Sequence, residues 1–431
     1  MIVVAFSGGG TRAAAFAYGA LEALRDTEFE VRGKKTRMID EVDVITGVSG
    51  GSFTALAYAL YGEQLFDEYE QRFLKRDVQS ELVSRVFSPL WWPGLASPTF
   101  GRSELAEDYY DEILFNGATF ADIMGNGRPI VVASATDLST GARFSFVQTN
   151  WDLICSDLAK VRLSRAAAAS SAVPVILSPV TITNYGGTCG YRDPEWVRAF
   201  TTTDTRTRPA NRTLKRYQEL QALQDSAERP YLHLVDGGVS DNLGMRAVLE
   251  GLEQIEASEE FRRTSGIDRI RRIAVFVVNS VSAPRRDWDK SEQPPGTIQI
   301  LVKAAGVPIE RYSYEAVELL RDTIFRWQTF RSLRAASAFP SGNNPLLARA
   351  VDVPDIELYA IDVSFAALPD AVEREYLNAM TTSFSLTSEQ VDHLRAAARA
   401  IIQDSPEFKR LVRDMSSDTA VPAGRVPAMM P

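Results

Sequence analysis

A strand, a glycine turn and a helix follow one another twice near the N-terminus, and this repeat limits the possible folds most. The apolar run Ile2–Phe6 is followed, after one serine, by three glycines and then by the Ala- and Leu-rich segment 11–26, which has helical spacing. A second apolar run, residues 42–47, also ends in glycine and leads into an apolar helical segment. Strands that alternate with helices are typical of a parallel sheet covered by helices. The sequence therefore predicts an α/β fold.

Further strands and a C-terminal helix are predicted along the rest of the chain. Residues 128–148 predict two strands joined by a turn, and residues 231–252 repeat the order of strand, glycine and helix. Buried strands are also predicted at 270–280 and 355–365. Residues 386–412 are predicted to be helical, with Thr387 as the N-cap.

No stretch of linker composition divides the chain. We therefore expect a single domain over residues 1–415, with a core at about 1–280 and a C-terminal elaboration at about 281–415. The last residues, 416–431, are expected to form a disordered tail.

Composition and charge exclude several classes of protein. The 431 residues are 45% hydrophobic, enough for a packed core, and the net charge of −9 argues against nucleic-acid binding, which needs clustered Lys and Arg. With two cysteines, Cys155 and Cys189, we expect no disulfide framework, and with only two histidines we expect no zinc site. No loop has the ligand spacing of a calcium site. We therefore expect neither a metal nor a cofactor.

The sequence predicts no membrane span and no signal peptide. No apolar run approaches the roughly 20 residues that cross a bilayer. The apolar start has no basic region before it and no small-residue cleavage site after it, so we interpret it as a strand. The bacterial cytoplasm and a membrane surface both stay open as locations, and an upstream leader that has been removed is compatible with the sequence.

Residues 47–51, Gly-Val-Ser-Gly-Gly, fit the spacing Gly-x-Ser-x-Gly between a strand and a helix. In a sharp turn of this kind the hydroxyl of Ser49 is lifted clear of the backbone. Gly47 and Gly51 flank it because a Cβ at either position is expected to clash with the strand or the helix. The alternative is an ordinary glycine turn, but the context favours a nucleophile.

Gly8, Gly9 and Gly10 end the first strand and open a helix. Their amides, with the helix dipole, suit an anion such as the oxyanion of acyl transfer. A dinucleotide-binding loop is the rival, since Gly8-x-Gly10-x-x-Ala13 fits its spacing. That reading requires an acidic residue at the end of the second strand, where this sequence has the Ser49 turn instead. The two glycine turns together favour an oxyanion site.

Asp236 ends an apolar strand and precedes two glycines, Gly237 and Gly238. The repeated strand–glycine–helix order predicts that its carboxylate lies at the same edge of the sheet as the two earlier turns. His233 lies three residues earlier, so its side chain is expected on the opposite face, as a packed strand histidine. His393 lies in the predicted C-terminal helix, where no nearby residue in the sequence suggests a catalytic role. Asp236 is left as the base for Ser49, in a two-residue dyad.

In this order, these motifs resemble the patatin-like phospholipase family. The resemblance covers roughly residues 1–280 and includes the segment "ASSAVPVILSP" at 169–179, similar to a fourth, Pro-containing block. It implies a three-layer α/β/α sandwich with a mostly parallel central sheet, and hydrolysis of lipid acyl esters. By this resemblance Ser49 is the nucleophile and Asp236 the base.

The resemblance also assigns supporting roles. The amides of Gly8, Gly9 and Gly10 form the oxyanion hole, and Arg12 is the motif arginine, which either binds an anion or holds the loop. Gly47, Gly51, Gly237 and Gly238 support the two turns. Ala13 stands where many members have glycine, which is expected to alter helix packing more than chemistry.

The expected activity is that of a phospholipase A or lysophospholipase, with a phospholipid or another lipid ester as substrate. A non-lipid carboxylesterase or acyltransferase on the same dyad is one alternative, and a non-catalytic nucleotide-binding protein is another. Trp91 and Trp92 either meet a membrane surface or close the core or a subunit contact. Residues 319–334 form an Arg-rich amphipathic helix, more typical of a buried helix with a solvated face than of a membrane-surface helix.

Overall fold

The computed structural model describes residues 1–417, except for single residues and short ranges within them. The excluded positions are 32, 89–99, 126, 128, 175, 194–210, 258, 284–287 and 336–353. Trp91 and Trp92 lie outside the described residues, as does nearly all of the predicted tail at 416–431.

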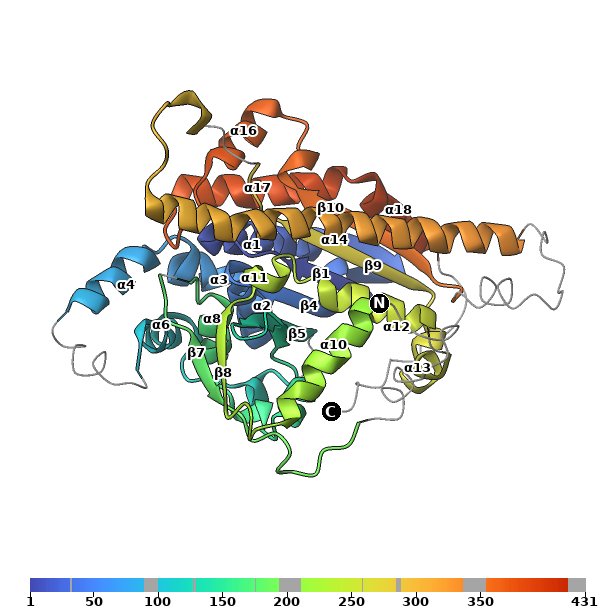
Figure 1. The fold of residues 1–431 in the computed structure, drawn as a ribbon. Helices are drawn as coiled ribbons and strands as arrows, with labels where there is room; N and C mark the ends of the chain where they lie inside the picture. The colour runs from blue at the N-terminus through green and yellow to red at the C-terminus, as the bar shows by residue number, and fades with distance from the viewer. Residues whose placement is uncertain are drawn as a thin grey trace.

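A mixed sheet forms the centre of the molecule (Figure 1). Within the described residues it has eight strands in the order β10-β9-β1-β4-β5-β8-β7, with β6 beside β5. The strands are β1 (Ile2–Phe6), β4 (Val42–Val48), β5 (Ile130–Asp137), β6 (Arg143–Ser145), β7 (Val180–Thr183), β8 (Tyr231–Asp236), β9 (Arg272–Asn279) and β10 (Glu357–Ser364). A separate hairpin pairs β2 (Glu28–Val31) with β3 (Lys34–Arg37). All the strands predicted from the sequence are present.

Helices surround this sheet. They are α1 (Gly10–Asp26), α2 (Gly50–Tyr61), α3 (Leu65–Tyr69), α4 (Val78–Phe87), α6 (Arg102–Tyr110), α7 (Gln148–Leu153), α8 (Leu163–Ser170), α10 (Asn211–Gln221), α11 (Gly238–Asp241), α12 (Arg246–Ala257), α13 (Glu259–Thr264), α14 (Thr297–Ala335), α16 (Ala371–Ala379), α17 (Ser388–Asp404) and α18 (Pro406–Ser416). Among the described helices, none combines the length and apolar character needed to cross a membrane.

Successive side chains along a strand point to opposite faces of the sheet, so the core consists of two hydrophobic clusters, one on each face. Val4 and Phe6 of β1 share one cluster with α1 and with Leu394 of α17. Ala5, between them, points to the other face and joins a cluster with α12 and with Trp327 of α14. Helices therefore cover both faces of the sheet, and the predicted three-layer α/β/α architecture is confirmed.

The C-terminal region is built into this sheet. β10 pairs in parallel with β9 along its whole length. Thr387 caps the N-terminus of α17, because its hydroxyl accepts the N–H of Gln390 at 3.2 Å, so the predicted N-cap is confirmed. α17 lies so close to α1 that a Cβ on Gly19 would come within 2.5 Å of the Arg395 carbonyl oxygen. Arg395 in turn forms a bidentate pair with the buried Glu22. The boundaries predicted for core and elaboration stay a prediction.

The direction of β8 differs from the expectation. The repeated order of strand, glycine and helix predicts that Asp236 lies at the same edge of the sheet as the two earlier turns, and it does lie there, bonded to Ser49. The same order also implies a strand parallel to the others. Instead β8 runs antiparallel to β5, and Ala135 faces Asp236. β5 extends beyond β4, whose last residue Val48 pairs with Ser134. β8 pairs with this extension and runs back along it. Asp236 thus reaches the end of β4 from the opposite direction.

The Arg-rich segment 319–334 is part of α14, which runs across the front of the sheet in Figure 1. Its apolar residues Leu320 and Trp327 are buried. Arg321 pairs with Asp362 at 3.0 Å, and Arg326 pairs with Glu256 at 2.6 Å. The interpretation as a buried helix with a solvated face is therefore confirmed for this segment.

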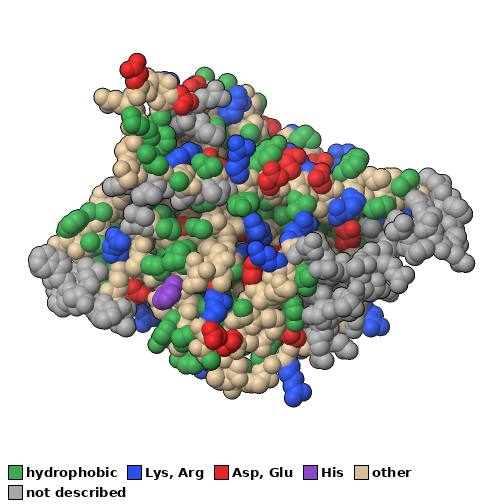
Figure 2. Space-filling view, viewed as in Figure 1, with side chains coloured by type: hydrophobic (Ala, Val, Ile, Leu, Met, Phe, Trp, Pro, Cys, Tyr) green, Lys and Arg blue, Asp and Glu red, His purple; other side chains and the backbone are tan. Residues whose placement is uncertain are grey.

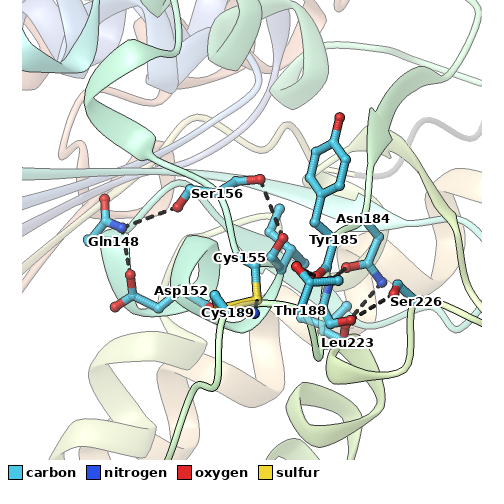
Figure 3. Close-up of a disulfide and its surroundings, with 12 residues drawn as sticks. Gln148, Asp152, Cys155, Ser156, Asn184, Tyr185, Thr188, Cys189, Leu223 and Ser226 are labelled. Atoms are coloured by element: carbon cyan, nitrogen blue, oxygen red, sulfur yellow. Dashed lines mark hydrogen bonds between the residues drawn. A yellow bond between two sulfur atoms is a disulfide. The ribbon is translucent and has the colours of Figure 1, made fainter.

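Cys155 and Cys189 form a disulfide, with their Cα atoms 5.6 Å apart (Figure 3). The expectation that the two cysteines bring no disulfide framework missed this link, because a sequence separation of 34 does not reveal spatial proximity. Beside the disulfide, the Asn184 side chain donates to the carbonyl oxygens of Leu223 and Arg229. The disulfide and these bonds tie the segment after β7 to the end of α7 and to residues before β8.

Replacing both cysteines with serine is expected to lower the free energy of unfolding by about 3–4 kcal/mol, because the link restricts the unfolded chain over a loop of this length. Urea titration of the double-serine variant against the wild type measures the effect. Wild-type protein under a reducing agent is the control and should lose the same amount. Equal midpoints, or two reactive thiols in the unreduced native protein, would contradict the link.

Candidate active site

Ser49 lies in a sharp turn between β4 and α2. Its backbone has φ 49° and ψ −122°, a left-handed conformation that non-glycine residues rarely adopt. The flanking glycines are required by space. A Cβ on Gly47 would come 2.7 Å from the Ser52 Cα atom, and one on Gly51 would come 2.6 Å from the Ser7 carbonyl oxygen. The structure therefore gives the predicted turn, with Ser49 at its apex.

Asp236 accepts a hydrogen bond from the Ser49 hydroxyl. The Ser49 Oγ donates to Asp236 Oδ2 at 2.8 Å, and the Gly238 N–H donates to Asp236 Oδ1 at 2.7 Å. Both side chains are largely covered, since Ser49 is 4% exposed and Asp236 is 8% exposed. The two residues named from the sequence are thus brought together in a buried pair.

Burial changes the acidity of this pair. Loss of solvent raises the pKa of Asp236 from its ordinary 3.8 to about 6, because the charged form is disfavoured away from water. The hydrogen bonds from Gly238 and Ser49 act in the other direction and limit the rise. A carboxylate with this pKa is ionised at neutral pH and is a stronger base than an exposed aspartate.

Neither histidine contacts the pair. His233 is exposed, and its Nδ1 lies 3.0 Å from the Thr181 hydroxyl across β7 and β8. It was expected to be packed; instead its face of β8 meets solvent. The expectation that it points away from the Asp236 side is confirmed. His393 lies on α17, 2.8 Å from Glu373.

The glycine loop before α1 lies directly against Ser49. A Cβ on Gly8 would come 3.3 Å from the Ser49 Cβ atom. The Gly8 N–H is already bonded, because it donates to the Asn242 carbonyl oxygen at 2.8 Å. Gly9 and Gly10 have φ of 142° and 63°, and within the described residues their amides have no hydrogen-bond acceptor. Of the three amides predicted as oxyanion donors, those of Gly9 and Gly10 are therefore left without a hydrogen bond, whereas that of Gly8 is used.

Arg12 fastens this loop to the C-terminal region. Its guanidinium is buried and donates to the Met380 carbonyl oxygen at 2.8 Å and to the Ser282 hydroxyl at 2.6 Å. Next to it, the Thr11 N–H donates to the Ser383 carbonyl oxygen at 2.9 Å. Of the two roles considered for Arg12, these contacts favour holding the loop over binding an anion.

Some residues of the site were not identified from the sequence. Ser170 contacts the Ser49 backbone, yet the sequence marks the segment 169–179 only as a motif and indicates no role for any residue in it. Asn242 and Ser383 hold the glycine loop through backbone carbonyl oxygens, which any residue type supplies, so no sequence signal marks them.

No metal site is evident in the part of the chain that the structure describes. Within it, no group of three or more His, Cys, Asp or Glu side chains is placed to hold a metal ion. On the described surface seen in Figure 2, Lys and Arg side chains are interspersed with acidic and apolar ones. This face offers no continuous basic surface of the kind that nucleic acid needs.

Comparison with known proteins identifies the family. The model of the family described as patatin-like phospholipase matches residues 4–249. No curated protein matches the chain. Among solved structures, human GIVD cytosolic phospholipase A2 is similar, with 14% identity and a TM-score of 0.45 over 97% of this chain and 62% of that one. VipD from Legionella pneumophila has 12% identity and a TM-score of 0.31 over 96% of this chain and 66% of that one.

The chain spans only 62% of the length of the human enzyme, and similarity at this level does not bear on substrate. The match to the family model is stronger evidence, because it covers more than half of the 431 residues. It also contains the glycine loop, the Ser49 turn and Asp236 in the expected order. The chain therefore belongs to the patatin-like phospholipase family.

Proposed function

We propose that this protein is a lipid acyl hydrolase of the phospholipase A or lysophospholipase type, with Ser49 as nucleophile and Asp236 as base. The observation that carries the proposal is the 2.8 Å hydrogen bond from the Ser49 hydroxyl to Asp236, made in a strained turn between a strand and a helix. A serine hydroxyl that donates to a buried carboxylate is arranged to lose its proton as it attacks.

In the proposed reaction, the Ser49 oxygen attacks the ester carbonyl carbon while its proton passes to Asp236. The carbonyl electron pair moves onto oxygen and forms a tetrahedral oxyanion. When the intermediate collapses, the bond to the leaving alcohol breaks and Asp236 gives the proton to that alcohol. Water then attacks the acyl-enzyme by the same route and releases the fatty acid.

The oxyanion is best stabilised by the amides of Gly9 and Gly10. Both lie at the N-terminus of α1, where the helix dipole adds positive potential. The Gly8 amide was proposed as a third donor, but its bond to Asn242 makes it a brace for the loop. Loss of one such donor typically costs about 10²–10³ in kcat.

A fluorophosphonate is expected to label Ser49 covalently, because it reacts with activated serines. Mass spectrometry of the digested protein locates the label, which should lie on the peptide that contains Ser49. A Ser49→Ala variant, treated in the same way, is the control. Unlabelled wild-type protein, or a label on another serine with Ser49 unmodified, would overturn the proposal.

The rate should depend on pH in the way that the Asp236 pKa dictates. The base must be ionised, so kcat/KM is expected to be constant above about pH 7 and to fall tenfold per pH unit well below 6. A pH–rate profile with a soluble ester measures this midpoint. A midpoint near pH 4, the ordinary range of an exposed aspartate, would contradict a buried base.

A lipid ester is proposed as the substrate because of the family, and two activity measurements test this proposal. Phospholipid vesicles should be hydrolysed with greater kcat/KM than a short-chain ester of equal intrinsic reactivity. Addition of an acceptor alcohol should leave free fatty acid as the main product. Preference for the short ester favours a general carboxylesterase, and transfer to the alcohol favours an acyltransferase.

A further inference from the structure

The end of helix α8 is inserted between the strands that carry the proposed dyad. Ser170, its last residue, is fully buried. Its hydroxyl accepts the Ser49 N–H at 2.9 Å and donates to the Ser134 carbonyl oxygen at 2.7 Å. The directions of both bonds are fixed, because an amide N–H only donates and a carbonyl oxygen only accepts.

The same helix end also holds the strand of the base. The Ser170 carbonyl oxygen accepts the Gly237 N–H at 3.1 Å, and the Ala172 carbonyl oxygen accepts the Asp236 N–H at 2.9 Å. One residue, Ser170, therefore bonds the nucleophile turn through its side chain and the base turn through its backbone.

The sheet alone does not fix the distance between the two turns. β4 and β8 are not neighbours, because β5 lies between them, and they run in opposite directions. A small shift of either strand along β5 would separate Ser49 from Asp236. The end of α8 bonds β4, β5 and β8 at one point, through Ser49, Ser134 and Gly237.

We propose that Ser170 is a positioning residue that keeps the Ser49 hydroxyl in line with Asp236, an inference that rests on the proposed function. Its hydroxyl gives the Ser49 amide an acceptor in a turn whose backbone conformation is otherwise unfavourable. Without that acceptor, the buried N–H loses its partner and the turn relaxes toward another conformation. Displacements of about 1 Å in such a pair cost roughly 100-fold in rate.

Ser170→Ala is therefore expected to lower kcat for ester hydrolysis and the rate of fluorophosphonate labelling by about 10- to 100-fold, with KM within about twofold of wild type. The midpoint of the pH–rate profile should stay where it is, because the Ser170 hydroxyl does not contact the Asp236 carboxylate. Ser164→Ala is the matched control. Ser164 lies in the same helix and is equally buried. Its hydroxyl has no hydrogen-bond partner among the described residues.

Wild-type protein separates this inference from the proposed function. If Ser49 of the wild type is neither labelled nor active, the proposed function fails. If the wild type is active and Ser170→Ala matches Ser164→Ala in kcat and labelling, the positioning role is wrong; an increase in KM alone also contradicts it. Should Ser170→Ala not fold, Ser170→Cys keeps the side-chain volume with a weaker hydrogen-bonding group, and a wild-type kcat in that variant overturns the inference.

Discussion

Ser49→Ala is expected to reduce kcat for ester hydrolysis by at least about 10³-fold, because it removes the atom that forms the acyl-enzyme. The fold should be retained, since alanine fills the same backbone position and only one buried hydrogen bond, to Asp236, is lost. Fatty-acid release from phospholipid vesicles, measured beside the melting temperature, separates loss of chemistry from loss of structure.

Ser164→Ala serves again as the matched control and should keep the wild-type kcat, because the same atom is removed from an equally buried site outside the pair. A Ser49→Ala protein that melts like the wild type and still hydrolyses ester at more than about a tenth of its rate would refute Ser49 as the nucleophile.

Asp236→Asn is expected to abolish activity and to stabilise the protein at neutral pH. Asparagine cannot accept the Ser49 proton, so a loss of at least about 10³-fold is expected. Its amide can still accept from Gly238 and donate to the Ser49 oxygen, so the shape of the site is kept. Activity and stability should therefore change in opposite directions.

The sign of the stability change follows from the pKa. Burial raises the pKa of Asp236 above its unfolded value, so the folded state binds the proton more tightly. As pH rises from about 4 to 6, the free energy of unfolding falls, because the unfolded state gives up this proton more readily than the folded state does. Above pH 6 the full cost of burying the charged carboxylate is present. At pH 7 to 8 Asp236→Asn should gain about 1–3 kcal/mol, and the gain should vanish below pH 4.

Urea titrations at pH 4 and pH 7.5 measure this difference. Asp137→Asn provides a contrast, because Asp137 is a buried carboxylate paired with Arg229, and removing that charge should destabilise the protein. If Asp236→Asn instead loses the same amount of stability at both pH values, burial does not destabilise the charged carboxylate.

The parts of the site that depend on local sequence were predictable. Glycines at 47 and 51 are dictated by space within a single turn, so their pattern is legible from the sequence. Strand parity correctly separated His233 from Asp236 because it needs only the two-residue repeat of one strand. The order of motifs also led to the correct family and to the three-layer fold.

What depends on distant segments was not predictable in the same way. The repeated order of strand, glycine and helix implies a parallel strand before Asp236, yet β8 pairs with the free end of β5 and runs antiparallel to it. The local sequence of a strand does not determine which strand it will pair with in the sheet. Likewise, the Gly8 amide is bonded to Asn242, more than 200 residues later, and the cysteine pair spans 34 positions. Such contacts are properties of the assembled fold.

The anchoring of the glycine loop by the C-terminal region has a consequence for synthesis. A nascent chain that has emerged from the ribosome only as far as β9 already contains Ser49 and Asp236. It lacks the Met380 and Ser383 carbonyl oxygens that hold Arg12 and Thr11. The proposed oxyanion amides are therefore secured only once residues 380–383 have also been synthesised. On the proposed mechanism, hydrolytic competence therefore depends on a segment that is synthesised after both residues of the dyad.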